Sequence, residues 1–208
     1  MSDKIRIAVL VSGGGTNLQA LLDAQAAGKL PSGEIALVVS NTAGAYALER
    51  AKKAGVPSCT ILKKALGSQA AFEDALEAKL REFDIQVIIL AGFLNILSAN
   101  FTEKYPQRIL NVHPSLIPSF CGEGFYGLRV HEAALQYGVK VTGATVHYVN
   151  QIPDGGKIIA QKAVEILPGD TPQVLQRRVM EKAEWVLLPQ AAEQVCREIM
   201  NHSSEDAK

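Results

Sequence analysis

Short apolar runs alternate with amphipathic segments along the first half of the chain. The runs that predict buried strands cover residues 5–11, 35–39, 58–62, 87–90 and 109–113. Between these runs, apolar residues recur at helical spacing, most clearly at Phe72, Leu76 and Leu80. Helices are expected after the first strand, over 43–54, from about residue 68 and over 99–104. This alternation predicts an α/β fold, a Rossmann-like and mostly parallel sheet with helices on both faces.

The pattern changes after the fifth of these strands. A connection at 119–127, rich in glycine and aromatic residues, precedes a helix expected over 128–137. Residues 141–149 and 157–166 are then expected to form two strands around a Pro-Asp-Gly-Gly turn. The two strands predict an antiparallel C-terminal hairpin that extends the same sheet.

The last part of the chain predicts a helix with a polar end. This helix begins near Thr171, and Pro189 is expected to interrupt it, because proline lacks the N–H that a helix interior needs. Residues 201–208 are polar and are expected to form a frayed tail. With 208 residues, 48% of them apolar, and with no linker or repeat, the chain is expected to form a single domain.

Charge and cysteine content argue against several classes of protein. Lys plus Arg and Asp plus Glu each number 21, and no basic run could neutralise a row of phosphates, so nucleic acid is not expected as a partner. No apolar run reaches membrane-spanning length, and the chain enters its first strand directly, so a cytoplasmic location without membrane contact is expected. The cysteines include no Cys-x-x-Cys pair, which suggests neither a disulfide framework nor a metal site.

A glycine-rich stretch at 12–17 joins the first strand to the first helix. Such a turn brings backbone N–H groups and the positive end of a helix against a phosphate. Leu18 stands where a dinucleotide fingerprint needs a small residue, and the Gly-Lys-Ser/Thr of a nucleoside triphosphate loop is missing. The pattern predicts a cradle for one phosphomonoester, formed by Gly14, Gly15, Thr16 and Asn17. A tight turn whose polar side chains only cap the helix explains the stretch equally well.

Polar residues stand at the end of the fifth strand, where Pro114 prevents its continuation. Parallel α/β sheets bind ligands at this end of their strands. The amide of Asn111 can polarise a carbonyl, the imidazole of His113 can carry a proton, and a carboxylate such as Asp154 can orient that imidazole. Acyl transfer to an amine needs these three functions, and no activated Ser or Cys accompanies them, so direct transfer is the simpler inference. Taken singly, each residue can equally be a strand cap or a turn residue.

Four stretches together resemble the phosphoribosylglycinamide formyltransferases, the folate-dependent glycinamide ribonucleotide transformylases of purine biosynthesis. They are Ser12–Gln19, Leu90–Phe93, Asn111–Pro118 and Thr145–Gly156. The Asn-x-His-Pro-Ser-Leu-x-Pro motif with its later Asp marks the wider formyltransferase superfamily, and the glycine stretch with Asn17 narrows the likeness to this family. The resemblance implies transfer of a formyl group from 10-formyltetrahydrofolate to the amine of glycinamide ribonucleotide.

The resemblance also implies a role for each candidate residue. Asn111 would hydrogen-bond the formyl oxygen, His113 would stabilise the oxyanion or shuttle protons, and Asp154 would pair with His113 and relay a proton through water. The implied substrate-binding residues are Gly14, Gly15, Thr16, Asn17, Gly92, Pro114 and Glu184. Glu184 matches a carboxylate near the substrate amine or sugar, although an apparent one-residue insertion shifts the helix there.

The folate pocket implied by the resemblance combines apolar walls with backbone partners, as a flat pterin requires. Its implied residues are Leu90, Phe93, Leu94, Asn95, Ile96, Leu97, Val149, Asn150 and Gln151. Asn95 and Gln69 stand where many members carry arginines associated with the folate tail. The resemblance implies one formyltransferase domain over 1–208, with a phosphate-binding half at 1–100 and a catalytic and folate-binding half at 101–190, either a monomer or a homodimer.

Two alternatives to this enzyme remain. A formyltransferase that acts on tRNA would need an added C-terminal domain and a basic surface, and a formyltetrahydrofolate hydrolase would need an N-terminal regulatory domain; neither fits 208 residues with zero net charge. A catalytically silent sugar-phosphate or folate-binding module is the other alternative. His131 and His147 rank below the three candidate catalytic residues, and the sequence does not predict how the loop at 121–129 sits over the site.

Overall fold

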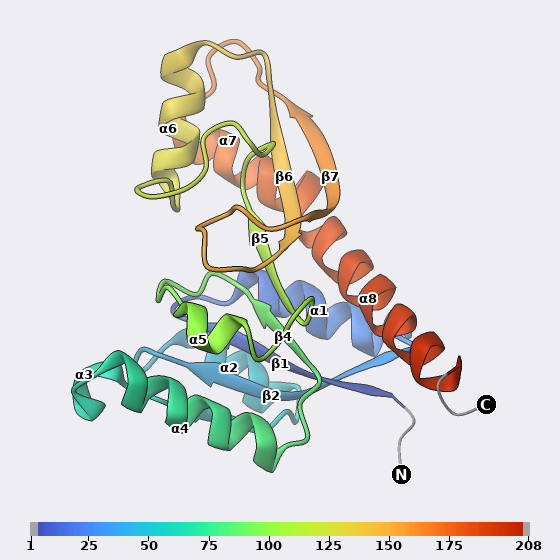
Figure 1. The fold of residues 1–208 in the computed structure, drawn as a ribbon. Helices are drawn as coiled ribbons and strands as arrows, with labels where there is room; N and C mark the ends of the chain where they lie inside the picture. The colour runs from blue at the N-terminus through green and yellow to red at the C-terminus, as the bar shows by residue number, and fades with distance from the viewer. Residues whose placement is uncertain (1–3, 206–208) are drawn as a thin grey trace.

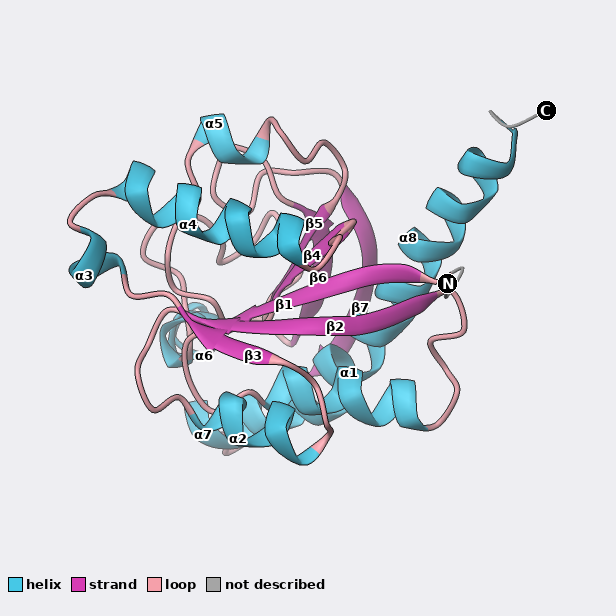
Figure 2. Ribbon diagram, turned by 90° about the horizontal axis from the view of Figure 1, so that it is seen from below, coloured by secondary structure: helices cyan, strands magenta, loops and turns pink. Residues whose placement is uncertain are grey.

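The computed structural model describes residues 4–205, which form one seven-stranded sheet with helices on both faces (Figures 1 and 2). The strands are β1 (Ile5–Val11), β2 (Gly33–Ser40), β3 (Ser58–Thr60), β4 (Val87–Leu90), β5 (Ile109–His113), β6 (Val141–Tyr148) and β7 (Ile158–Glu165). The helices are α1 (Thr16–Ala26), α2 (Tyr46–Lys53), α3 (Lys63–Leu66), α4 (Gln69–Glu82), α5 (Ala99–Thr102), α6 (Leu128–Tyr137), α7 (Pro172–Val179) and α8 (Trp185–Glu205). A π-helical turn, Met180–Glu184, joins α7 to α8.

The order of the strands in the sheet is β3-β2-β1-β4-β5-β6-β7. All pairs from β3 to β5 are parallel, whereas β5 pairs with β6 and β6 with β7 in the antiparallel direction. The predicted fold class, a mostly parallel sheet with an antiparallel C-terminal hairpin, is therefore confirmed. This order places the carboxyl ends of β1, β4 and β5 side by side at one edge of the sheet.

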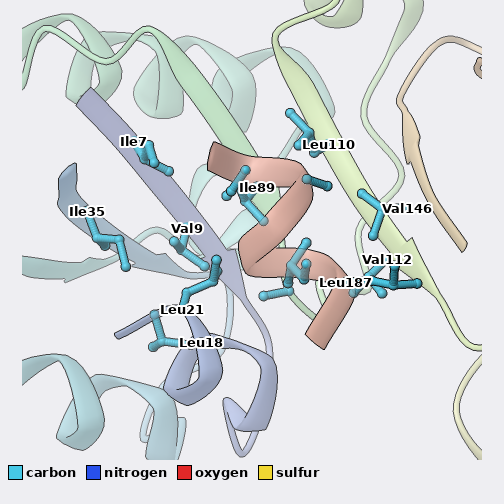
Figure 3. Close-up of a cluster of buried hydrophobic side chains, with 14 of the residues drawn as sticks. Ile7, Val9, Leu18, Leu21, Ile35, Ile89, Leu110, Val112, Val146 and Leu187 are labelled. Carbon is cyan, nitrogen blue, oxygen red and sulfur yellow. The ribbon is translucent and has the colours of Figure 1, made fainter. Parts of the chain in front are cut away.

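Alternate side chains of the strands build two hydrophobic clusters, one on each face of the sheet. Val9 packs on one face with residues of α1, α2, α7 and α8, and Figure 3 shows it next to Leu21 of α1. On the other face, Leu10 packs with Phe72 of α4 and Phe101 of α5. Because successive strand residues point to opposite faces, both layers of helices are anchored by the same strands.

The C-terminal helix departs from its predicted course. Pro189 does not interrupt it: α8 runs through this position, and the irregular turn comes earlier, at Met180–Glu184. A proline is tolerated where the preceding turn already departs from α-helical hydrogen bonding. The tail expected to fray over 201–208 is helical as far as Glu205, and its last residues lie outside the described part of the chain. The short helix α3 was not predicted.

None of the helices within residues 4–205 is both long and apolar enough to cross a membrane.

Candidate active site

Three segments with candidate residues meet at the carboxyl ends of β1, β4 and β5. The glycine loop, defined here as residues 12–15, follows β1; Gly92, with a φ of 72°, follows β4; and Pro114 follows β5 directly. The backbone N–H of Leu94 donates to Ser12 Oγ at 2.8 Å, which ties the segment after β4 to the glycine loop. The regions predicted to bind phosphate, folate and the formyl group therefore share one edge of the sheet.

Strand pairing gathers the candidate side chains on one face of the sheet. Asn111 and His113 alternate with core residues of β5, so both point to the same side. In the antiparallel register Asn111 lies opposite His147 and His113 lies opposite Thr145. Since directly opposite residues share a face, His147 is brought next to the predicted pair.

Asp154 completes this group from the loop between β6 and β7. Its Oδ2 accepts a hydrogen bond from the Gly122 N–H at 2.9 Å and lies 3.4 Å from His113 Nδ1. Its Oδ1 lies 3.4 Å from His147 Nε2. Burial raises the pKa of the Asp154 carboxyl, but His147, His113 and the Gly122 N–H together outweigh burial and hold the pKa below its ordinary value. The side chain is thus kept as a carboxylate between two imidazoles.

The orientation of His113 follows from its two neighbours. Its Nε2 lies 2.9 Å from the carbonyl oxygen of Phe120, and a carbonyl only accepts, so Nε2 carries a hydrogen. Its Nδ1 faces Asp154, so both ring nitrogens face acceptors. The loop at 119–127 therefore lies against the site, with the Phe120 carbonyl and the Gly122 N–H both turned toward it.

His147 contacts this group, although the sequence ranked it lower. Its Nδ1 lies 2.8 Å from the Tyr148 carbonyl oxygen and must therefore carry a hydrogen; its Nε2 accepts from Asn111 when the ring is neutral and donates to Asp154 when the ring is protonated. Asn111 Nδ2 lies 3.2 Å from that Nε2 and 3.4 Å from Asp154 Oδ1. This contact fixes which way the Asn111 amide points. The sequence signal for the contact of His147 with Asn111 was the alternation of the strand at 141–149. This alternation places His147 on the same face as Asn111 only once the strand register is known.

The backbone N–H groups of Gly14 and Gly15 in the glycine loop have no acceptor among residues 4–205. Gly15, with a φ of 72°, is the N-cap of α1, and within the described part of the chain no side chain accepts from the first turn of that helix. The alternative that a polar side chain merely caps the helix is therefore wrong. An uncapped N-terminus presents N–H donors and a partial positive charge, which is the environment that an anion prefers.

Asn17 and Glu184, which are 167 positions apart, are brought together beside this loop. Asn17 Nδ2 donates to Glu184 Oε2 at 2.7 Å, while Asn17 Oδ1 is buried and bonds to none of residues 4–205. Burial raises the pKa of Glu184 to about 7, and the hydrogen bond from Asn17 only partly opposes this. Glu184 ends the π-helical turn, and such a turn is a one-residue insertion into an α-helix, which accounts for the insertion inferred from the sequence.

The segment predicted to line the folate pocket divides into buried and exposed side chains. Leu90 and Leu97 are buried in the cluster on the α4 face, and Phe93 and Val149 pack against it. Leu94 and Ile96 are 67% and 68% exposed. The predicted residues that are not apolar, Asn95, Asn150 and Gln151, are half-buried or exposed. The segment thus presents apolar side chains both to the core and to the surface.

Gln69 and Glu73 of α4 hold this segment in place. Gln69 Nε2 donates to the Ile96 carbonyl at 3.1 Å and to Glu73 Oε1 at 2.5 Å. The buried Glu73 carboxylate also accepts from the Ser98 N–H at 2.7 Å and from Ser98 Oγ at 2.5 Å. Nothing in the sequence singles out Glu73, because a glutamate on a helix is usually solvated.

His131 is buried on α6 near the site. Within residues 4–205, neither of its ring nitrogens has a hydrogen-bond partner. Burial, with a smaller contribution from His113, lowers the pKa of His131 to about 4. His131 is therefore neutral at physiological pH. Asn111, His113 and Asp154 are called the Asn–His–Asp group from here on, and His131 makes none of the contacts that hold this group.

The fold is α/β, and the Asn–His–Asp group at the carboxyl-end edge of its sheet has the functional groups that acyl transfer needs. A family model described as formyl transferase matches residues 5–191. Phosphoribosylglycinamide formyltransferase of Haemophilus influenzae is 40% identical over 184 residues, which cover 88% of this chain and 84% of that protein. The chain belongs to the formyl transferase family and, within it, to the phosphoribosylglycinamide formyltransferases.

Similar proteins include both single enzymes and longer chains. The crystal structure of glycinamide ribonucleotide transformylase 1 from Symbiobacterium toebii is 41% identical with a TM-score of 0.88, and the likeness covers 95% of this chain and 90% of that one. The trifunctional purine biosynthetic protein adenosine-3 of Gallus gallus is 45% identical over 196 residues, which cover 93% of this chain. The chain spans only 19% of the length of that trifunctional relative.

Proposed function

We propose that the protein transfers the formyl group of 10-formyltetrahydrofolate to the primary amine of 5′-phosphoribosylglycinamide, a step in the de novo synthesis of the purine nucleotide IMP. One observation carries the proposal: a glycine loop with free N–H groups and the Asn–His–Asp group share one edge of the sheet. The loop suits a phosphomonoester, and the group suits acyl transfer. Relatives that bear the name of this enzyme support the same reaction.

The proposed chemistry is direct transfer through a tetrahedral intermediate. The substrate amine attacks the formyl carbon, a C–N bond forms, and the carbonyl oxygen becomes an oxyanion. An amide hydrogen of Asn111, released from His147 or Asp154, would bond this oxyanion, and His113, oriented by Asp154, would stabilise its charge. The bond from the formyl carbon to N10 of the folate then breaks, and the proton lost by the amine reaches N10 through water beside Asp154.

The ribonucleotide would be held from its phosphate to its amine along the same edge. The N–H groups of Gly14, Gly15, Thr16 and Asn17 would bind the phosphate. Glu184 and Asn17 Oδ1, which has no partner among residues 4–205, would meet the sugar hydroxyls or the amine, since both present buried acceptors beside the loop. Gly92 and Pro114 would line the path between the loop and the Asn–His–Asp group.

The folate would lie against the segments after β4 and β6. Leu90, Phe93, Leu97 and Val149 supply apolar walls, and the exposed Leu94 and Ile96 would cover the bound ring. Asn95, Asn150 and Gln151 would provide polar contacts at its edges. Gln69 holds the Ile96 carbonyl, so it would support this pocket from behind rather than bind the glutamate tail.

A steady-state assay of the purified protein tests the proposal. The folate product is followed with 10-formyltetrahydrofolate in the presence and absence of 5′-phosphoribosylglycinamide. We expect turnover only when the ribonucleotide is present. Turnover without the ribonucleotide would point to a hydrolase, and no turnover with both substrates would favour a binding module. The cytoplasmic location, the monomeric or homodimeric state and the division of the domain into two halves stay predictions.

A further inference from the structure

We propose that Arg50 of α2 is a positioning residue that turns the N–H groups of the glycine loop toward the phosphate. Its Nε donates to the carbonyl oxygen of Gly14 at 2.8 Å, and its Nη1 donates to Gln19 Oε1 of α1 at 2.9 Å. Arg50 thus links three parts of the fold: α2, the glycine loop and α1. The inference rests on the proposed function, because it concerns how the phosphate of that substrate is held.

The peptide geometry of the loop gives the direction of this effect. In a trans peptide unit the C=O and the following N–H point in opposite directions. Arg50 holds the Gly14 carbonyl toward α2, so the Gly15 N–H points away from α2. The Ala47 N–H likewise holds the Gly13 carbonyl at 3.1 Å, which turns the Gly14 N–H to the same side. Two adjacent donors therefore point to the same side of the loop, which is the arrangement that a backbone nest for an anion needs.

These two N–H groups have no other use in the fold. Neither the Gly14 nor the Gly15 N–H donates to any of the described residues. A peptide that could rotate freely would present its carbonyl to the phosphate about as readily as its N–H. Fixing the carbonyl from behind removes that unfavourable orientation before the ligand arrives, which is how preorganisation improves affinity.

The contact requires arginine at this position. The planar guanidinium of Arg50 bonds Gly14 and Gln19 at once and lies 5.0 Å from the centre of the Tyr46 ring. A lysine carries the same charge but no rigid fork, so it cannot be expected to hold both partners in one plane. A side chain at Gly15 would lie 2.6 Å from Ala47 Cβ, so α2 also packs directly against the loop.

The test compares Arg50→Ala and Arg50→Lys with Lys53→Ala. Lys53 lies on the same helix, 5.9 Å from the centre of the same Tyr46 ring, so its removal is a matched loss of charge. The measurements are the Kd for inorganic phosphate by calorimetry, the KM for each substrate, and kcat. Loss of a hydrogen bond from a charged donor predicts that Arg50→Ala weakens phosphate and ribonucleotide binding by roughly tenfold to a hundredfold. The kcat and the folate KM should stay within about twofold of wild type, because Arg50 does not reach the reacting atoms.

Several outcomes would overturn the inference. Unchanged phosphate affinity in a folded Arg50→Ala protein is one, and an equal loss in Lys53→Ala, which would indicate a general charge effect, is another. We expect Arg50→Lys to recover only part of the affinity, and full recovery would show that charge alone is enough. If Arg50→Ala does not fold, Arg50→Lys carries the same test.

Failure of the inference can be told apart from failure of the proposed function. Phosphate binding that depends on Arg50 in a protein without formyl transfer would keep the inference and remove the function. Formyl transfer with a phosphate affinity that does not change in the Arg50 variants would keep the function and remove the inference.

Discussion

At the scale of single residues, the paired imidazole and carboxylate of the site should act mainly in the transition state. We expect His113→Ala and Asp154→Asn each to lower kcat by about two orders of magnitude or more, with modest effects on the KM of either substrate. The reason is that the charge they oppose develops only as the oxyanion forms. Steady-state kinetics with both substrates check this, and wild-type turnover in either variant would remove that residue from the mechanism.

The buried Glu184 predicts a pH dependence of stability. Its pKa is raised from 4.5 to about 7, so the folded state binds its proton more tightly than the unfolded state. Its carboxyl therefore costs nothing below pH 4.5 and destabilises the fold increasingly as the pH rises toward 7. Glu184→Gln keeps an acceptor for Asn17 and removes this cost, so it should stabilise the protein by about 2 kcal/mol more at pH 8 than at pH 5.

Urea denaturation at the two pH values measures that difference. Glu181→Gln is the control, because Glu181 lies in the same turn but is exposed and paired with Arg177. An equal gain for Glu184→Gln at both pH values would contradict the raised pKa.

Single residues were predictable where their chemistry is local. Asn111 and His113 stand at a strand end that prolines mark in the sequence, and Asp154 stands in a turn. The contact of Asn17 with Glu184 was not predicted, because it joins residues 167 positions apart; the resemblance implied only that both residues bind the substrate. The contact of His147 with Asn111 depends on a strand register that a single sequence does not give.

At the scale of elements, Gln69 and Glu73 of α4 clamp the segment after β4 through hydrogen bonds to Ile96 and Ser98. This clamp should control folate binding. Glu73→Gln would weaken the acceptor of Ser98 and Gln69 and loosen residues 93–98. We expect the folate KM to rise about tenfold while the KM for the ribonucleotide stays near wild type, because the glycine loop is held separately. Glu77→Gln, on the next turn of α4 and paired at the surface with Lys104, should change neither KM. An equal rise in both KM values would indicate general loosening rather than a local clamp.

The packing of α2 against the glycine loop gives a second prediction at this scale. Gly15→Ala would force a side chain into a left-handed conformation and within 2.6 Å of Ala47 Cβ. We expect a loss of about 2 kcal/mol or more in the free energy of unfolding, together with weaker ribonucleotide binding. Gly13→Ala is the matched substitution, since a Cβ there meets no atom within 4 Å, and its unfolding free energy should stay near wild type. Calorimetric or urea unfolding of both variants checks the contrast.

Elements with strong periodicity were predicted closely, and irregular ones were not. Residues 87–90, 109–113 and 128–137 were expected as strands and a helix and have those bounds. The π-helical turn was not predicted, because an insertion in a helix can equally be absorbed by a kink or a break. The interruption predicted at Pro189 was wrong, because the irregular turn lies earlier, at Met180–Glu184.

At the scale of the whole molecule, the alternation of strands and helices along the sequence predicted the fold class, but it did not predict how far the core extends. The family model ends at residue 191, yet α8 continues beyond it into the cluster on the α1 face. Val195 is 2% exposed and Cys196 is fully buried. Glu193 accepts hydrogen bonds from the N–H and Oγ of Ser32 at 3.0 and 2.7 Å. The helix past residue 191 is thus part of the core as far as Ile199.

Removing this part of α8 should prevent folding. A chain that ends at Ala191 loses the burial of Val195, Cys196 and Ile199, each worth about 2 kcal/mol, and both contacts of Glu193. Their sum is comparable to the total stability of about 5–15 kcal/mol that a typical domain has. We expect this chain to lack a cooperative unfolding transition by circular dichroism. Val195→Ala in the full chain should cost about 2 kcal/mol, whereas Gln194→Ala on the exposed side of the same helix should cost less than about 0.5 kcal/mol. A truncated chain that unfolds cooperatively near the wild-type temperature would show that the family model already contains the complete core.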